Sequence, residues 1–580
     1  MNKSLPYLFC LLALSGCQLL PQPAESPATE TSAPAEAATP ATPPVVRNFD
    51  RGALYDLLLA EMAGQRQQPG QALQGYRRQL ERTQSPAVAE RALRIAEYMN
   101  DQSLALESAL LWAQLAPDDA SAQRAAALEL TKNNRYQQAL DYTSRAISLD
   151  PDSEGHFDFI AFTAAHADPA MRNALVQRLV QLDSQHPDRS ELKLAQAILL
   201  QEDAPGQALQ LLHKLPASDR QSSVALALQA RLYLQLDQPE RSLELQQQLL
   251  ERQPDNQNVR FSYARQLINY NRLEEARNEF VTLLQNEPDN DDFRLALAYL
   301  YMDLEAWQEA LLYFQELIER DSYTDTALYN QGRCLEALDQ PQLAINAYQG
   351  ITEGQYFLAA QQQLGHLWLQ LDSPQHFARQ LARARQLAPD EHASLLQIEI
   401  DVLNRNQHSE LAWQRAQYAL AQFPDHPGLL YSRAMLAEKR NDLTQLETDL
   451  RHILTLDPAH AVAMNALGYT LADRTGRYQE ALSLIQRAHQ LQPDDPATLD
   501  SLGWVYYRLD QPAEALSWLE KAHAVYPDPE VSAHLGEVLW ALGEKRKARK
   551  VWRDALKEDP EHDILRETMQ RLDTRKGWLK

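Results

Sequence analysis

The chain has 580 residues, of which 44% are apolar and 23% charged. That length supplies several hydrophobic cores or one very extended core, so a single compact globule is not expected. Glycine is scarce, at 18 residues, which disfavours all-β and dinucleotide-binding folds because both need tight glycine turns. Asp and Glu outnumber Lys and Arg by 79 to 55, a formal net charge of -24, so we expect no nucleic-acid partner.

The first residues have the pattern of an export signal. Lys3 is followed by a short apolar stretch that ends in Leu14-Ser15-Gly16-Cys17. This string resembles the lipobox of bacterial lipoproteins, in which the cysteine is lipidated and becomes the new N-terminus. We therefore predict a signal peptide over 1–16 and lipidation at Cys17, with an ordinary cleaved signal peptide as the alternative. Gln18, in place of aspartate, implies the outer membrane, facing the periplasm.

Residues 17–47 are predicted to be a disordered tether that follows the lipidated cysteine. The stretch from Gln18 to Val46 holds seven prolines and no basic residue, so it cannot bury a core. In polyproline geometry it reaches roughly 90 Å at most. No later apolar run in the sequence is long enough to cross a bilayer.

A repeat with a period of 34 residues fills the rest of the chain. Ala481, Ala488 and Pro493 form one set of two small residues and a proline, and equivalent alanines recur 34 residues apart. Within a period, the apolar spacing predicts two helices. Small residues let two antiparallel helices approach closely, and the proline ends the second helix. Further sets are Ala139/Ala146/Pro151, Ala412/Ala419/Pro424, Ala515/Ala522/Pro527 and Ala548/Ala555/Pro560.

These repeats resemble the tetratricopeptide repeat. Leu467-Gly468-Tyr469 and Leu502-Gly503-Trp504 match its leucine–glycine–aromatic pattern. The resemblance implies an all-α, right-handed superhelical solenoid of about 15 helix pairs over 48–580. The spacing is stretched between about 151 and 222, where the register stays open, and Ser322 stands where a proline is expected.

In this family, ligands lie along the concave surface built by the first helices. The residue just after each leucine–glycine pair, or its equivalent, faces that groove, and such positions carry side chains that binding hot spots favour. The alternative is that these side chains pack between neighbouring repeats. The resulting candidates are Tyr299, Arg333, His366, Met435, Tyr469 and Trp504.

The first predicted helix carries more apolar residues than one helix face can hold. Leu54, Tyr55, Leu57, Leu58 and Met62 surround it, although a terminal helix of a solenoid should be polar outside. Either the next helix pair covers the surplus, or these residues anchor a partner, which would make this a protease-docking helix.

The C-terminal end is locally basic. Residues 544–580 hold twelve Lys or Arg against eight Asp or Glu. The favoured interpretation is a basic helix that caps the solenoid. The alternative is a docking patch for an acidic partner or for lipid headgroups.

Catalytic and metal-binding motifs are missing from the sequence, so we expect no catalytic residues, no metal and no cofactor. Residues 287–292 resemble a calcium loop only faintly, since the glycine and the glutamate at its key positions are missing. Cys334 lies in a predicted helix and is expected to be a buried packing thiol.

The whole layout of lipobox, tether and uninterrupted array resembles tetratricopeptide outer-membrane lipoproteins that partner a periplasmic carboxyl-terminal processing serine protease. The resemblance implies a scaffold that binds and activates the protease and delivers peptidoglycan hydrolases for degradation. Two alternatives stay open. One is a pilotin-like or assembly lipoprotein for an outer-membrane secretion, barrel or polysaccharide machine, and the less favoured one is a peptidoglycan hydrolase.

Overall fold

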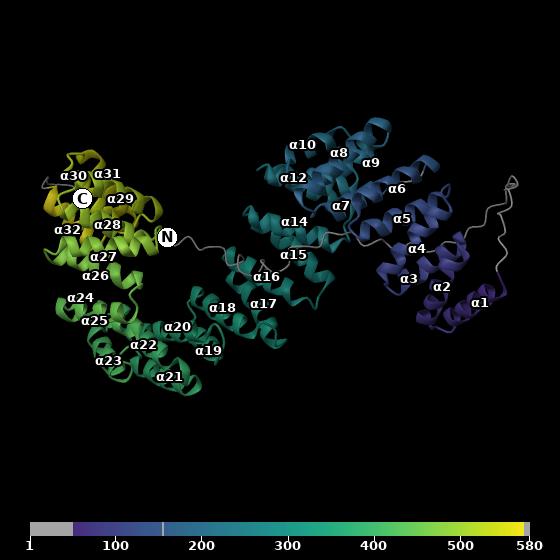
Figure 1. Cartoon of the computed structure of the whole chain (residues 1–580). Helices are drawn as coiled ribbons and strands as arrows, with labels where there is room; N and C mark the ends of the chain where they lie inside the picture. The colour runs from purple at the N-terminus through teal and green to yellow at the C-terminus, as the bar shows by residue number, and fades with distance from the viewer. Residues whose placement is uncertain (1–49, 153–155, 574–580) are drawn as a thin grey trace. The chain divides into compact units, whose positions relative to one another are not determined.

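The computed structural model describes residues 50–152 and 156–573. The predicted signal peptide, Cys17 with Leu14, Ser15 and Gly16, and the tether lie outside the described residues. Within the described ranges the chain is helical, with no strand (Figure 1). The all-α prediction is therefore confirmed. None of the described helices is long and apolar enough to cross a membrane.

The described chain divides into two compact units, one ending at Glu287 and one beginning at Pro288. The helices of the N-terminal unit are α1 (Arg51–Gln65), α2 (Pro69–Thr83), α3 (Pro86–Tyr98), α4 (Gln102–Leu115), α5 (Ala120–Lys132), α6 (Tyr136–Leu149), α7 (Phe157–Ala164), α8 (Pro169–Gln185), α9 (Ser190–Leu200), α10 (Pro205–His213), α11 (Ala217–Arg220), α12 (Ser223–Gln235), α13 (Pro239–Arg252), α14 (Gln257–Asn269) and α15 (Leu273–Asn286).

The C-terminal unit continues the same alternation, and one three-residue 3-10 helix, η2 (Pro389–Glu391), lies between two of its helices. Its helices are α16 (Asp291–Asp303), α17 (Trp307–Glu319), α18 (Thr324–Ala337), α19 (Pro341–Gln349), α20 (Phe357–Gln370), α21 (Pro374–Leu387), α22 (His392–Arg405), α23 (Ser409–Gln422), α24 (Pro427–Lys439), α25 (Leu443–Leu456), α26 (Ala461–Arg474), α27 (Tyr478–Leu491), α28 (Pro496–Arg508), α29 (Pro512–Val525), α30 (Pro529–Ala541), α31 (Lys545–Glu558) and α32 (Asp563–Leu572).

The helices of the described chain form fifteen consecutive pairs, with short α11 between two pairs and α32 after the last. The expectation of about 15 helix pairs is confirmed. Close approach within a pair depends on the glycine of the leucine–glycine motif. A Cβ on Gly503 would lie 2.4 Å from Leu519 Cγ, and one on Gly536 would lie 1.9 Å from Trp552 Nε1. The repeated alanines are buried at the same interfaces, as Ala515 shows with no exposed surface.

Local sequence explains where the helices begin and end. Asp495 accepts a hydrogen bond from the backbone N–H of Thr498 at 2.8 Å and so caps α28. Pro496 follows at the first helical position, where a proline costs no hydrogen bond. Asp510, with a φ of 61°, makes the turn between α28 and α29. Asp and Asn tolerate this left-handed conformation better than most residues.

The stretch whose register the sequence left open keeps the order of helices with altered lengths and packing. Helix α7 has only 8 residues and α8 has 17, both pack mainly on α9, and the extra helix α11 stands before α12. At the missing proline, Tyr323 adopts a left-handed φ of 50° just before α18. Each irregularity is absorbed in a connection or a helix end, so the alternation of first and second helices continues.

Several successive first helices of the C-terminal unit pack directly on one another, namely α20 on α22, α22 on α24, α26 on α28 and α28 on α30. The second helices of the same pairs are not packed together in this way. Closer spacing among first helices is what a curved stack produces on its inner side. We call the surface they form, from α16 to α30, the first-helix face.

Candidate functional site

Two of the predicted groove residues meet on the first-helix face between α26 and α30. Tyr469 of α26 donates a hydrogen bond from its hydroxyl to Glu530 Oε1 at 2.8 Å. Trp504 of α28 is buried, and its indole Nε1 donates to Asp473 Oδ1 at 3.1 Å. Both aromatic side chains therefore bind carboxylates that come from other repeats.

His534 of α30 lies at the centre of this cluster. Its ring stacks on that of Trp504, with centroids 4.2 Å apart, and its Nδ1 lies 3.0 Å from both carboxylate oxygens of Asp500. Burial by itself would lower the pKa of His534. The Asp500 carboxylate, with Glu530 and Asp473 nearby, outweighs that effect and raises the pKa above its ordinary value of 6.5.

Acidic side chains from three repeats gather around the same aromatic rings. Burial raises the pKa of Glu438 on α24, and the nearby carboxylates of Glu530 and Asp473 raise it further, against the opposing effect of Arg474. Asp473 is balanced in part by Arg508, at 3.7 Å. This part of the first-helix face thus combines buried and half-buried aromatic rings with carboxylates that arginines neutralise only in part.

Tyr299 and Arg333, two other groove candidates, take part in side-chain contacts between α16 and α18. Tyr299 is 5% exposed and packs edge-on against Phe314, with ring centroids 6.0 Å apart. Asn330 donates to its hydroxyl at 3.4 Å and accepts from Arg333 Nη1 at 3.5 Å. Tyr299 therefore packs between neighbouring repeats, and Arg333 is half-buried beside it.

The remaining candidates, His366 and Met435, are also half-buried. Asn406 Nδ2 of α22 lies 3.1 Å from His366 Nδ1 of α20. Burial lowers the pKa of His366, and the cation of Arg405 lowers it further. Met435 packs against the core of its unit. A ligand-binding role for any of the six residues stays a prediction.

Sequence reasoning missed the carboxylates and the histidine of the α24–α30 cluster. A signal was available for one of them, because Asp473 follows Tyr469 by one helical turn and so shares its face. Asp500 and His534 precede their leucine–glycine motifs instead. Their pairing could not be read from spacing, because it joins two different repeats.

Helix α1 at the other end of the described chain exposes its large apolar side chains. Leu54, Tyr55, Leu58 and Met62 are 45–62% exposed. Leu59, which was not among the predicted residues, is 46% exposed beside them. Leu57 is half-buried against the core of α2–α4. The next helix pair therefore does not cover the surplus of apolar residues. We call Leu54, Tyr55, Leu58, Leu59 and Met62 the α1 stripe.

Small and polar residues hold α1 in this orientation. Its buried residues are all alanines, such as Ala60, and a Cβ on Gly75 of α2 would lie 2.7 Å from the Cβ of Ala60. Gln79 donates to Asp56 at 2.8 Å, and Arg91 pairs with Glu61 at 2.9 Å. These contacts turn the alanine side of α1 toward α2, so the stripe faces solvent.

The basic helix of the C-terminal end is α31, whose apolar side is buried. Ala548, Trp552 and Ala555 pack into the core of the last repeats, and α32 covers the end of α30. Lysines and arginines occupy the outer face of α31. Because α32 follows α31, the capping role of the basic helix stays a prediction.

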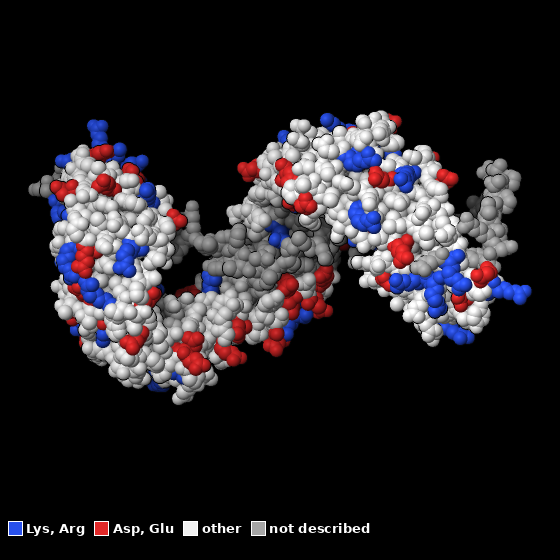
Figure 2. Space-filling view, in the orientation of Figure 1, with Lys and Arg blue, Asp and Glu red and all other residues white. Residues whose placement is uncertain are grey.

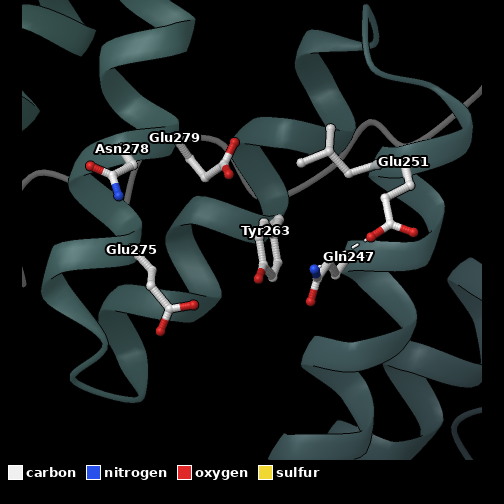
Figure 3. A pocket seen from close by; sticks show the side chains of 7 residues that line it. Gln247, Glu251, Tyr263, Glu275, Asn278 and Glu279 are labelled. Carbon is white, nitrogen blue, oxygen red and sulfur yellow. Dashed lines mark hydrogen bonds between the residues drawn. The ribbon is translucent and has the colours of Figure 1, made fainter.

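A groove of about 330 Å³ opens in the N-terminal unit between α13 and α15, with α14 at its floor (Figure 3). Glu251, Glu275 and Glu279 point toward it around the ring of Tyr263. Burial raises the pKa of Tyr263, and Glu275 adds to the effect. Three carboxylates thus line this groove, and two of them are paired, Glu275 with Arg272 and Glu279 with Arg260. Elsewhere, Figure 2 shows basic side chains gathered over α2 and α3 and acidic ones over α17.

The described residues hold no group of His, Cys, Asp and Glu arranged to bind a metal ion. At the faint calcium-loop motif, Asn290 caps α16 by accepting from the backbone N–H of Phe293, and Asp291 pairs with Arg294 and Arg320. Cys334 is fully buried, and burial raises the pKa of its thiol to about 12. It packs in the core as expected.

Tetratricopeptide-repeat family models match residues 458–528 and, in a second model, 264–324, 295–356 and 501–563. The chain is 44% identical over 575 residues, 99% of its length and 96% of the relative's, to TPR repeat-containing protein PA4667 of Pseudomonas aeruginosa. It is 35% identical over 79 residues, 14% of the chain and 8% of the relative, to bacteriophage adsorption protein A of Escherichia coli.

Solved tetratricopeptide proteins are similar at low identity. One from Thermus thermophilus is 20% identical and covers 32% of this chain and 100% of its own, with a TM-score of 0.29. One from Parabacteroides merdae is 15% identical and covers 48% of this chain and 97% of its own, with a TM-score of 0.32. The helix pairs, the glycine contacts and the full-length relative lead to one conclusion: the chain belongs to the tetratricopeptide-repeat protein family, whose repeats are protein-interaction scaffolds.

Proposed function

We propose that the protein is an outer-membrane lipoprotein, anchored through Cys17, that binds and activates a periplasmic carboxyl-terminal processing protease. In this role it delivers substrates such as peptidoglycan hydrolases for degradation. The layout of the chain resembles that of the lipoprotein LbcA, the partner of such a protease. A scaffold that holds protease and substrate together raises their effective concentration without performing chemistry itself.

The α1 stripe is the observation that carries the proposal. Five large apolar side chains are exposed over two turns of one helix, and such a surface is costly to leave in water unless a partner covers it. Leucine, tyrosine and methionine at these spacings suit an apolar groove on the partner. We assign this surface to the protease.

The substrate-binding surface in this proposal is the first-helix face from α24 to α30. Tyr469 supplies a half-buried aromatic ring, with the buried ring of Trp504 in the same cluster, and Glu438, Asp473 and Glu530 supply negative charge. A segment of a cell-wall hydrolase with apolar and basic side chains would complement both features. Separate surfaces let the protease and its substrate bind at the same time.

The test uses a soluble form beginning at Gln18 and a catalytically inactive form of the protease. Replacing Leu54 and Leu58 together by serine is expected to weaken protease binding at least about tenfold in calorimetry. Leu312→Ser is the control, because Leu312 is 65% exposed, more than Leu54 at 52% or Leu58 at 56%, and lies on α17 of the other unit. Unchanged binding by the α1 variant, or equal loss in the control, would contradict the docking assignment.

Degradation assays separate the two surfaces. Trp504→Ala is expected to leave protease binding intact and to slow hydrolase degradation. Recovery of secretin or barrel components with the wild-type protein, and no binding of the protease, would instead favour an assembly lipoprotein.

A further inference from the structure

A second groove lies in the N-terminal unit, between the second helices α4 and α6 with the first helix α5 at its floor. It encloses about 680 Å³. Because two second helices form its walls, it is separate from the first-helix face and from the α1 stripe. Its lining residues are Leu110, Ala113, Gln114, Pro117, Gln123, Arg135, Gln138, Asp141, Tyr142 and Arg145.

This groove occupies the same place in its repeat as the acidic groove between α13 and α15. Gln114 and Glu251 are both the thirteenth residue of their helices, α4 and α13. Gln138 and Glu275 are both the third residue of theirs, α6 and α15. The repeat geometry is therefore shared, while two carboxylates of one groove are amides in the other.

Because Gln138 stands where the other groove has Glu275, Arg135 lacks the counterion that its equivalent, Arg272, has. Arg272, the residue before α15, pairs with Glu275, with Nη2 2.6 Å from Oε2. Arg135 stands at the same place before α6, and Gln138 in place of glutamate offers it no charge. No carboxylate within the described ranges pairs with Arg135.

Arg145 adds a second cation to the same wall. Its guanidinium lies over the Tyr142 ring, 5.3 Å from the centroid, and it has no carboxylate partner among the residues that the structure describes. Asp141, the acidic residue of the groove, is already paired with Arg178 at 2.9 Å. In a chain with a net charge of -24, this groove is locally positive.

Gln123 on the floor provides an unused hydrogen-bond acceptor. Its side chain is 1% exposed, and its Nε2 donates to the carbonyls of Ala113 at 3.0 Å and Pro117 at 3.3 Å. Because both partners are carbonyl oxygens, the atom of the Gln123 amide that contacts them is the donor Nε2, and the remaining atom is the acceptor Oε1. That oxygen has no partner within the described part of the chain. At the same place in α14, Arg260 donates to the Pro254 carbonyl and pairs with Glu279.

We infer that the α4–α6 groove binds a short acidic peptide segment. A carboxylate would bind the guanidiniums of Arg135 and Arg145, and a peptide N–H would donate to Gln123 Oε1. Leu110 and Ala113 offer apolar contact to a neighbouring side chain. The buried acceptor favours a peptide over a free carboxylate ion, because an ionised carboxylate carries no hydrogen to donate. This inference goes beyond the proposed function and does not depend on it.

Fluorescence anisotropy with two labelled octapeptides tests the inference. One peptide alternates leucine with glutamate, and the other alternates leucine with glutamine. At constant ionic strength, the soluble wild-type chain is expected to bind the glutamate peptide about tenfold more tightly. Equal affinity for the two peptides, or no binding of the glutamate peptide, would overturn the inference.

Two exposed substitutions locate the binding. Gln138→Glu gives Arg135 a counterion like the one that Arg272 has in Glu275. Arg145→Thr introduces the residue type that α15 has at the equivalent position, Thr282. Each is expected to weaken binding of the glutamate peptide about fivefold. Glu275→Gln in the α13–α15 groove is the matched control and should leave it unchanged. Wild-type affinity in both α6 variants would place the peptide elsewhere and refute the site.

Discussion

Two stretches of the first-helix face each hold a histidine, and their surroundings shift the pKa values of the two rings in opposite directions. Between α20 and α22, His366 faces the amide of Asn406 and the cation of Arg405, and its pKa is lowered. Between α28 and α30, His534 faces the carboxylate of Asp500, and its pKa is raised. Burial lowers the pKa of both rings, so the difference comes from the side chain that the neighbouring repeat supplies.

The comparison shows how a repeat protein can vary its binding surface without changing its fold. The helix pairs around both histidines use the same glycine contact, at Gly365 against Phe377 and at Gly536 against Trp552. What differs is the polar residue one repeat away. The two stretches therefore hold histidines whose pKa values are shifted in opposite directions by the residues that the neighbouring repeats supply.

Removing the carboxylate beside His534 should have the largest effect. Asp500→Ala leaves the buried Nδ1 of His534 without its hydrogen-bond partner, and we expect about 2 kcal/mol of local destabilisation. Hydrogen exchange of α28–α30 amides measures it. Asp494→Ala, in the exposed loop before α28, is the control. A change no larger than that of the control would mean that His534 is held by packing alone.

The two stretches should respond oppositely to pH. His534 has a raised pKa in the fold, so its contribution to stability is fully present below about pH 6.5 and is lost as pH rises through the folded value. His366 has a lowered pKa, so stability near it falls as pH drops from about 6.5 through its folded value. Urea unfolding between about pH 5 and 8, with His534→Gln and His366→Gln compared with wild type, gives both slopes. Slopes of the same sign would contradict the prediction that the two histidines have opposite effects on the pH dependence of stability.

Placing a carboxylate beside His366 should reverse the shift of its pKa. Asn406→Asp puts a negative oxygen where an amide now lies 3.1 Å from Nδ1, and we expect the pKa of His366 to rise by about one unit. Nuclear magnetic resonance of isotopically labelled histidine follows the titration, with His534 as the internal reference. A pKa that stays low would show that burial and the cation of Arg405 outweigh the introduced carboxylate.

The smallest effect is expected at Glu438. Burial and two neighbouring carboxylates disfavour its charge, so Glu438→Gln should stabilise the α24–α26 region by less than about 1 kcal/mol at pH 7. Thermal unfolding of the variant and of the wild type measures the difference in stability. Destabilisation would mean that Arg474 compensates the charge of Glu438 more fully than its surroundings suggest.

Most of the fold could be predicted from the spacing of small residues. Ala481, Ala488 and Pro493 repeat at the period of one helix pair, and all-α pairing follows from that period. The lengths of α7 and α8 could not be predicted, because irregular repeats lose the spacing that identifies helix ends. The candidate site was predicted only at Tyr469 and Trp504. The position of a residue in the repeat motif predicts that it lies on the first-helix face, but it does not predict which residues of other repeats it contacts.

The sequence by itself determined the repeated helix pair, the glycine and alanine positions at which the helices touch, and the excess of apolar residues on the first helix. These are local properties, set within one period of the chain. Only the tertiary structure decided that the α1 stripe is exposed, that His534 meets Asp500 and that Arg135 lacks a counterion. Each of these depends on how neighbouring helices pack, and burial and charge pairing are properties of that packing.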